Sequence, residues 1–264
     1  MSGNFISYMN TKTPVSATQV TGSVLFNLDM QNYSSAAPTV WPDTSGNGRN
    51  FTFYNVNTSV AAAPTTVNNI GTSTAYFSTN CFFGTGTGGG GGPNIWVKAQ
   101  APSAFMNSSL SYTKGFVTRG TFTNSIYPNN WWGAGYLAGT TDSRDTVWMS
   151  NGTLPALLQA GNHYSGSTYS DVVQAGYTGE SYNTWYYMSV SFDTTNGWTL
   201  YVNGILVGAT LDTKIGQNPV QPVIGTNMHG DIAAATYYSR VLSATEHAQN
   251  AAYWLSRYNG ATPA

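Results

Sequence analysis

The stretch that decides the fold class is WYYMSVSFDTTNGWTLYVNGILVGA, residues 185 to 209. Apolar side chains at every second position from Tyr186 to Phe192 show the period of a half-buried strand. Asn203-Gly204 separates the strand-like runs 198–202 and 205–209. This dipeptide favours a tight hairpin, because a type I′ turn needs two residues at positive φ. The stretch therefore predicts consecutive antiparallel strands.

A single helix is predicted after these strands. Ser243 with Glu246 three residues later forms a capping-box pattern, and the expected helix runs from Ala244 to Tyr258. Small and apolar residues on one face follow a spacing of three to four: Ala248, Ala251, Ala252 and Leu255. His247 falls outside this set, so it is expected on the helix surface.

Strand patterns also recur through the rest of the chain. They cover Val24–Leu28, Asn50–Val56, Ala75–Phe83, Leu110–Arg119, Thr146–Met149 and Asp171–Ala175. Residues 154–160 fit either a strand or a short turn of helix, and Trp131-Trp132-Gly133 is expected in an aromatic loop. Strands at this spacing, with Gly, Asn and Pro turns between them, predict an all-β, two-sheet antiparallel sandwich.

The order of the motifs resembles the concanavalin A-like lectin/glucanase superfamily, in particular its laminin-G-like branch. The matching motifs are Trp185, Phe192-Asp193, Leu200–Gly204, Gly230–Ile232, Arg240–Ser243 and Glu246, with Trp41–Gly48 as an early loop. The likeness spans roughly residues 20–260. It implies a jelly-roll sandwich with one C-terminal helix over residues 21–264, preceded by an extended N-terminal arm, residues 1–20.

Charge is scarce in this chain. Nine Lys and Arg and ten Asp and Glu make up 7% of 264 residues, and the net charge is −1. This charge gives no attraction to nucleic acid, and no apolar run is long enough for insertion into a membrane. A surface of hydroxyls and amides suits contact with sugars or with a neighbouring protein. The start, Met1–Tyr8, shows no cationic segment or apolar run of signal-peptide length.

Catalytic carboxylates of the glucanase type are not found. Enzymes of that superfamily place two or three carboxylates on one strand face, since the mechanism uses two carboxyl groups about 5–10 Å apart. The two glutamates here are Glu180, in a Gly-rich turn, and Glu246, in the capping box. Asp142 and Asp145 form the only close pair, in a predicted loop. A Ser-His-Asp triad stays open, although no Gly-x-Ser-x-Gly elbow occurs. The sequence therefore predicts no enzyme and no catalytic residue.

Calcium is the one metal that the resemblance implies. Lectins and laminin-G domains of this fold often hold Ca²⁺ through Asp, Asn and carbonyl oxygens. The loop Asp43–Gly48 places Asp43 and Asn47 four residues apart, so they are the candidate ligands. The alternative is that Asp43 makes an Asx turn and Asn47 lies in an ordinary turn.

Aromatic side chains in loops are the candidates for sugar contact, because a pyranose face stacks on an aromatic ring. Trp131, Trp132 and Tyr136 are the candidate carbohydrate-binding residues, with burial in the core as the alternative. Trp185 and Trp198 fall in strand patterns and are expected in the core.

Two functions follow from these features. The first is a non-enzymatic structural or attachment protein on a virion, a minor capsid, fibre or decoration component whose partners are other structural proteins. The second is a secreted or cell-surface carbohydrate-binding module whose partners are glycans. A catalytic glucanase or lyase is disfavoured by the missing carboxylates.

Overall fold

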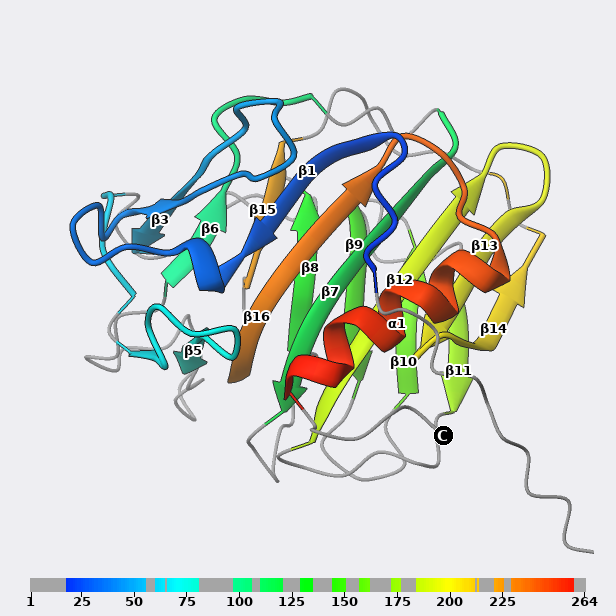
Figure 1. The fold of residues 1–264 in the computed structure, drawn as a ribbon. Coiled ribbons are helices and arrows are strands. Elements are labelled where there is room, and N and C mark those ends of the chain that lie inside the picture. The colour runs from blue at the N-terminus through cyan, green and yellow to red at the C-terminus, as the bar shows by residue number, and fades with distance from the viewer. Residues whose placement is uncertain are drawn as a thin grey trace, which may run out of the picture.

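The computed structural model describes residues 18–55, 60–64, 66–80, 97–105, 110–120, 129–134, 144–150, 157–161, 172–176, 184–211, 213, 221–225 and 229–258. Two eight-stranded antiparallel sheets pack face to face, and one helix, α1 (Ala244–Tyr258), lies across the outside of one of them (Figure 1). The predicted all-β sandwich with one C-terminal helix is confirmed. No helix among these residues is a candidate membrane span.

The sheet beneath α1 is called the front sheet, as drawn in Figure 1. Its spatial order is β14 (Ile205–Thr210), β13 (Gly197–Val202), β12 (Trp185–Asp193), β7 (Tyr112–Gly120), β16 (His229–Tyr238), β5 (Tyr76–Asn80) and β4 (Val67–Asn68), with β1 (Val24–Asp29) also paired to β16. A short 3₁₀ helix, Met30–Asn32, follows β1.

The back sheet lies behind the front sheet in the same view. Its order is β11 (Val172–Gly176), β10 (Leu157–Gly161), β9 (Arg144–Ser150), β8 (Asn129–Ala134), β15 (Pro222–Ile224), β6 (Val97–Gln100), β3 (Phe51–Asn55) and β2 (Val40–Trp41). Residues 157–161 therefore form a strand, the first of the two structures that the sequence left open.

The predicted hairpin is present between β13 and β14. Asn203 has φ 52° and Gly204 has φ 81°, the two positive values that a type I′ turn needs. The turn is also tied to the neighbouring strand, because the Asn203 backbone N–H donates to the Tyr187 carbonyl at 2.8 Å and the Asn203 side-chain oxygen accepts from the Tyr187 N–H at 3.0 Å.

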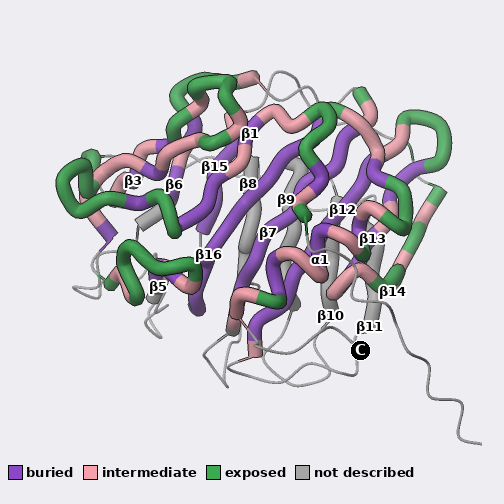
Figure 2. The backbone as a smooth tube through the Cα atoms, in the orientation of Figure 1, coloured by how far each residue is buried: buried purple, intermediate pink, exposed green. Residues whose placement is uncertain are grey.

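Strand β12 is buried on both faces, so the prediction of a half-buried strand is wrong. Tyr186, Met188, Val190 and Phe192 belong to the core between the sheets. Tyr187, Ser189 and Ser191, on the opposite face, are also buried, because α1 packs against this strand. Figure 2 shows β7, β12 and β16 buried along most of their length.

Aromatic rings fill the space between the sheets. Trp198 is fully buried there, in contact with Tyr112 and Phe192 at centroid distances of 6.1 and 4.9 Å. Trp185 is buried in a second cluster, beneath α1, with Trp254 and Leu255. The predicted core positions of Trp185 and Trp198 are confirmed.

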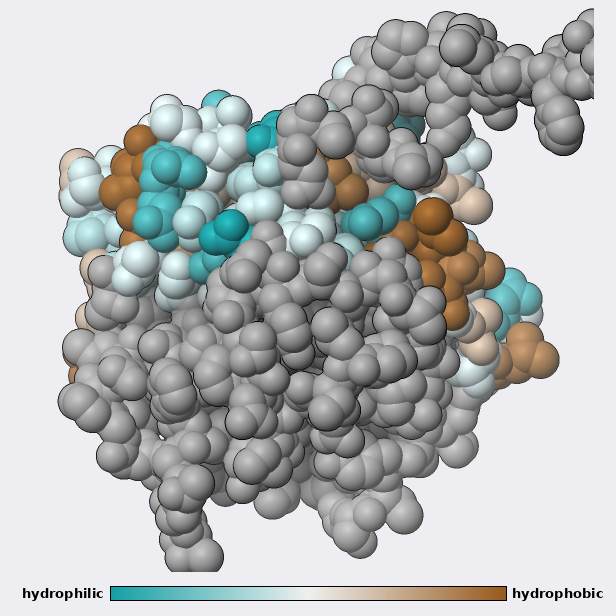
Figure 3. All heavy atoms as spheres, turned by 90° about the horizontal axis from the view of Figure 1, so that it is seen from below, coloured by the Kyte–Doolittle hydropathy of each residue, from teal (hydrophilic) through white to brown (hydrophobic). Residues whose placement is uncertain are grey.

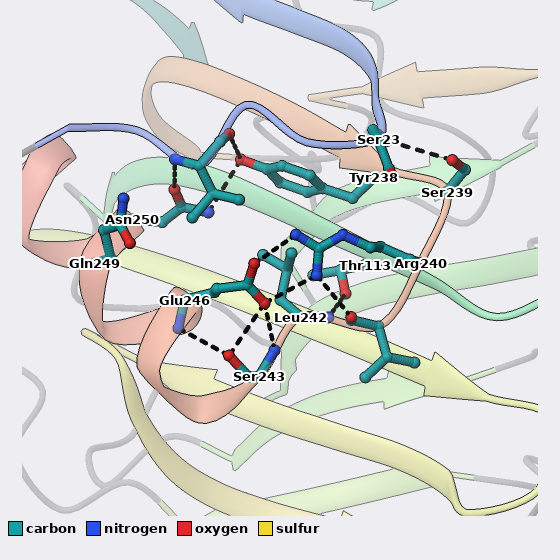
Figure 4. A network of polar contacts seen from close by, with 12 residues as sticks. Ser23, Thr113, Tyr238, Ser239, Arg240, Leu242, Ser243, Glu246, Gln249 and Asn250 are labelled. Atoms are coloured by element: carbon teal, nitrogen blue, oxygen red, sulfur yellow. Dashed lines mark hydrogen bonds and ion pairs between the residues drawn. The ribbon is translucent and has the colours of Figure 1, made fainter.

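The N-terminus of α1 has the predicted capping box (Figure 4). The Ser243 hydroxyl accepts from the Glu246 N–H at 3.3 Å, and the Glu246 carboxylate accepts from the Ser243 N–H at 2.9 Å. The same carboxylate accepts two hydrogen bonds from the Arg240 guanidinium, which lowers the pKa of Glu246 to about 2. The motif Arg240–Glu246 thus fastens the chain that leads from β16 into the helix.

The buried face of α1 differs from the predicted one. Its buried residues are His247, Asn250, Ala251, Trp254 and Leu255, whereas Ala248 is exposed. The helix is also joined to the start of the described chain. Asn250 accepts from the Val20 N–H at 2.8 Å and donates to the Tyr238 hydroxyl at 3.0 Å (Figure 4).

Residues 18–20 are therefore bonded to the domain, and the Tyr238 hydroxyl donates to the Val20 carbonyl at 3.0 Å. The rest of the predicted arm, residues 1–17, lies outside the described residues.

Candidate functional site

The inner face of the back sheet is identified by one row of directly opposed residues. Residues opposite each other in neighbouring strands lie on the same face of a sheet. The row comprises Phe53, Ala99, Ile224, Trp132, Val147, Ala160 and Val173. Phe53, Ala99 and Ile224 are fully buried in the core between the sheets. The register therefore places Trp132 on the core-facing side.

The outer face of the back sheet carries a polar row with one tryptophan. Asn130, Trp148, Gln159 and Gln174 stand directly opposite one another across β8, β9, β10 and β11. They alternate with the apolar core-side row, so they belong to the opposite face. We call these four residues the outer row. Three inter-strand spacings separate its ends, about 14 Å.

A β-bulge in β8 places Asn130 and Trp132, which are two positions apart, in different rows. The register shifts between Asn130 and Trp132, so Trp131 lies at an irregular position of the ladder. Bulges of this kind change the face on which the following residues lie. Asn130 is thereby aligned with Trp148 on the outer face, while Trp132 is aligned with Val147 on the core face.

The sequence-predicted carbohydrate residues are thus separated by the structure. Trp131 and Trp132 lie in β8, so the prediction of an aromatic loop is wrong. By register, Trp132 stands in the row that contains Phe53, Ala99 and Ile224. Tyr136 lies outside the described residues. The sequence does not single out Trp148, because Val147, Trp148 and Met149 are three consecutive apolar residues and show no alternation that separates two faces.

The outer row combines two kinds of side chain that bind sugars. An indole offers a broad apolar face with one N–H, and each side-chain amide offers two donors and one acceptor oxygen. A pyranose has the matching surfaces, namely an apolar face of C–H groups and a rim of hydroxyls.

The predicted calcium loop is held by hydrogen bonds from the chain itself. One oxygen of Asp43 accepts from the backbone N–H groups of Asn27 and Ser45, both at 2.9 Å. The other oxygen accepts from the Ser45 hydroxyl and the Arg49 N–H, also at 2.9 Å. A carboxylate has about four acceptor sites, so both oxygens are fully used.

The second predicted ligand, Asn47, directs its amide nitrogen at β1. It donates to the carbonyls of Val24 and Leu25 at 2.9 and 3.1 Å, and the Arg49 guanidinium donates to Leu25 at 2.7 Å. This arrangement is the Asx turn that the sequence left as the alternative, and it does not fit a calcium site. In the part of the chain that is described, no three His, Cys, Asp or Glu residues gather as a metal-binding group.

His247 is fully buried beneath α1, so the prediction of a surface position is wrong. Its ring nitrogens lie 2.7 Å from the Ser189 hydroxyl and 3.0 Å from the Ser191 hydroxyl, and its ring stacks on Tyr201 with centroids 3.8 Å apart. Burial lowers the pKa of His247 to about 4. These Ser–His pairs have no access to substrate, because the helix and sheet enclose them, and they serve to hold α1 in place.

A second polar cluster joins strands of the front sheet. The Arg119 guanidinium forms an ion pair with buried Asp231 at 2.6 Å, and the Ser78 hydroxyl donates to the same carboxylate, also at 2.6 Å. The guanidinium carbon lies 5.0 Å from the ring centre of Tyr76 and 4.8 Å from that of Trp185. The ion pair, the Ser78 hydrogen bond and the ring contacts together hold β5, β7, β12 and β16 to one another.

Comparison with solved structures identifies the architecture. No family model and no curated protein sequence matches the chain. The binding domain of botulinum neurotoxin DC, solved with SialylT, superposes on 86% of the chain with a TM-score of 0.59 and 12% identity. The chain has a concanavalin A-like jelly-roll fold. Its lectin-like architecture is the one that the motif order predicts.

Two further structures share this fold. Domain 4 of AbnA, a GH43 extracellular arabinanase from Geobacillus stearothermophilus solved with arabinotriose, has a TM-score of 0.55 and 14% identity over 87% of this chain and 98% of that domain. A Trypanosoma rangeli sialidase, solved with 2,3-difluorosialic acid, has a TM-score of 0.55 and 12% identity over 89% of this chain. The chain spans half of the neurotoxin chain and a third of the sialidase. Identities this low concern the fold alone.

Proposed function

We propose that this chain is a non-catalytic glycan-binding domain that holds a saccharide on the outer face of its back sheet. The observation that carries the proposal is the outer row, in which Trp148 stands in register with Asn130, Gln159 and Gln174. Glycan complexes of the neurotoxin domain and of arabinanase domain 4, which share the fold, support it.

Placement on a sheet suits this task. Neighbouring strands hold their backbones at a spacing of about 4.8 Å, so residues in register on one face recur at that spacing. A sugar ring stacked on Trp148 would have amides of neighbouring strands on both sides, from Asn130 and Gln159. Binding needs both features. Stacking alone gives little specificity, and water competes with the saccharide for hydrogen bonds to the amides.

Replacing Trp148 by Ala is expected to weaken glycan binding about tenfold or more, since an aromatic stacking contact contributes on the order of 1 kcal/mol beyond the loss of buried area. Isothermal titration against glycans selected on an array measures this. The matched control is Tyr54→Ala, because Tyr54 lies on the same outer face of the back sheet but in β3, four strands from β9. Equal losses for both variants, or no loss for Trp148→Ala, would remove the outer row as the site.

The non-catalytic part of the proposal has its own test. Glycans that bind should be recovered intact after long incubation, with no new reducing ends. Release of reducing sugar that is abolished by Asp142→Asn or Asp145→Asn would instead identify an enzyme and its carboxylates.

An assembly role, such as the predicted virion attachment protein, is a second candidate. The feature that favours it is the apolar edge at β14, where Ile205, Leu206 and Leu211 are 60%, 52% and 84% exposed. Figure 3 shows apolar atoms on the side of the molecule where β14 lies in Figure 1. β14 is the last strand of the described front sheet, and uncharged edge strands favour association with other chains.

The assembly role predicts a concentration-dependent association that the double variant Ile205→Thr, Leu206→Thr reduces without lowering the melting temperature. Sedimentation velocity measures the association, and thermal unfolding controls for the fold. Two results together would rule out an assembly role for the edge of β14. The protein would be a monomer at every concentration, and the variant would be incorporated into particles as well as the wild type.

A further inference from the structure

The two halves of α1 are attached to the front sheet by different kinds of contact. The first half, residues 244–251, buries two polar side chains, His247 and Asn250, beside a single alanine. The second half buries the large apolar side chains of Trp254 and Leu255. Burial of apolar surface therefore stabilises mainly the second half of the helix.

The last turn of α1 is also held by an ion pair. The Arg257 guanidinium lies 2.7 Å from the Asp29 carboxylate and donates to the Ser73 carbonyl at 2.8 Å. The Tyr258 hydroxyl donates to the Ala75 carbonyl at 3.0 Å. These contacts do not involve the first half, so they keep the C-terminal end of the helix in place when the first half is disturbed.

The attachment of the first half depends on a neutral His247. The fully buried ring contacts two hydroxyls, of Ser189 and Ser191, and stacks on Tyr201. A serine oxygen can accept from either ring nitrogen, but it has no negative charge to stabilise an imidazolium. Burial of a charge without a counter-ion is strongly unfavourable. The pKa of His247, which burial lowers to about 4, agrees with this environment.

The charged groups of the elements around His247 are engaged elsewhere. The Glu246 carboxylate of α1 accepts from the Arg240 guanidinium (Figure 4). On β12, the Asp193 carboxylate accepts from two backbone N–H groups of the exposed turn that follows the strand. On β7, Lys114 lies in register with residues of the core between the sheets. β13 and β14 contain no acidic or basic residue. Among the described residues, no carboxylate contacts the His247 ring.

We propose that protonation of His247 opens the first half of α1 from the front sheet, while the last turn and the two sheets stay in place. The sheets can remain paired, because the core between them contains no residue of α1. The Val20 N–H, which donates to Asn250 at 2.8 Å, loses its acceptor in the same step. This acid response does not depend on glycan binding.

Native-state hydrogen exchange of the full chain at pH 7 and pH 4, in urea below the unfolding transition, tests the proposal. The amides of residues 247–251 and of Val20 should open about a hundredfold more often at pH 4, after correction for the pH dependence of chemical exchange. Their opening should depend weakly on urea, because a local opening exposes little surface. The amides of β7 and β12 should open rarely and with a steep urea dependence.

The variant His247→Gln is the control, because glutamine does not titrate. Its residues 247–251 should change their opening frequency by less than about threefold between the two pH values. A pH response that persists in this variant would assign the effect to another group and overturn the proposal.

The wild type alone gives a second test, which holds even if the variant does not fold. At pH 4, residues 247–251 should open more often than residues 253–258. Equal opening of the two halves, or opening of residues 247–251 only with the frequency and urea dependence of β7 and β12, would overturn the proposal. The helix would then open only as a whole or with the entire domain.

Discussion

Acidification from pH 7 to pH 4 is expected to lower the free energy of unfolding by about 3 kcal/mol through His247 alone. The unfolded histidine has a pKa near 6.5, whereas burial lowers the pKa of His247 to about 4 in the folded protein. The unfolded chain therefore takes up the proton first. The contribution of His247 to stability is complete above pH 6.5, falls through the window from 6.5 to 4, and is exhausted below pH 4.

The groups that contact the His247 ring do not stabilise its protonated form. Ser189 and Ser191 on β12 contact its two nitrogens, and Tyr201 on β13 stacks on its ring. The nearby carboxylate of Glu246 is engaged by Arg240, and its pKa of about 2 keeps it ionised through this pH window. The contribution of the Glu246 carboxylate to stability is lost only below pH 4.5, where an unfolded glutamate takes up a proton.

Urea unfolding of the wild type and of His247→Gln at pH 7, 5.5 and 4 measures this effect. Glutamine keeps a donor and an acceptor but does not titrate, so the stability gap between the two proteins should shrink by about 3 kcal/mol as the pH falls. Parallel curves would show that His247 is not the acid-sensitive group.

Gly204→Ala is expected to cost about 3 kcal/mol of stability. Gly204 has φ +81°, and an added Cβ would lie 2.6 Å from the Ala248 Cα, which is backbone and has no flexible end to move aside. The left-handed conformation contributes about 1 kcal/mol, and displacement of α1 from the hairpin contributes the remainder. Thermal and urea unfolding measure the change.

Gly46→Ala is the matched control for that experiment. Gly46 has φ +86°, and its Cβ would meet nothing within 4 Å. It should therefore show only the conformational cost, about 1 kcal/mol. Equal losses for the two variants would mean that the hairpin does not press on the helix.

Local signals predicted much of the front sheet. The alternation in β12, the Asn203-Gly204 turn and the Ser243–Glu246 capping box depend on residues a few positions apart, and the structure has all three. The burial of β12 on both faces was missed because it depends on α1, which lies about sixty residues along the chain. In the sequence alone, Ser189 and Ser191 show the pattern of solvent-facing residues. In the structure, both contact the His247 ring.

The buried face of α1 differs from the predicted face for the same reason. The small residues Ala248 and Ala252 suggested a face, but the structure buries polar His247 and Asn250 beside Trp254. Polar groups are tolerated in a core when partners satisfy them, and these partners come from β12, from Tyr238 and from Val20. A helical periodicity built on apolar residues alone does not contain that information.

The candidate site was the least predictable part. The sequence predicts Trp131, Trp132 and Tyr136 as loop aromatics, whereas the outer row depends on pairing across β8 to β11 and on a bulge at Trp131. Register of this kind is set between strands and has no local signature. Asp43 and Asn47 were correctly located in a tight loop, but their partners on β1 and at Arg49 determine how their oxygens are used.

The central claim is that a glycan lies on the outer face of the back sheet. Amide hydrogen exchange with and without saturating glycan tests it most directly, because protection reports where the ligand binds. The expected result is slower exchange in Arg144–Ser150 and Leu157–Gly161, with no change in α1 or in residues 43–49. Protection confined to residues 43–49 or to the face beneath α1, with β9 and β10 unchanged, would contradict the claim.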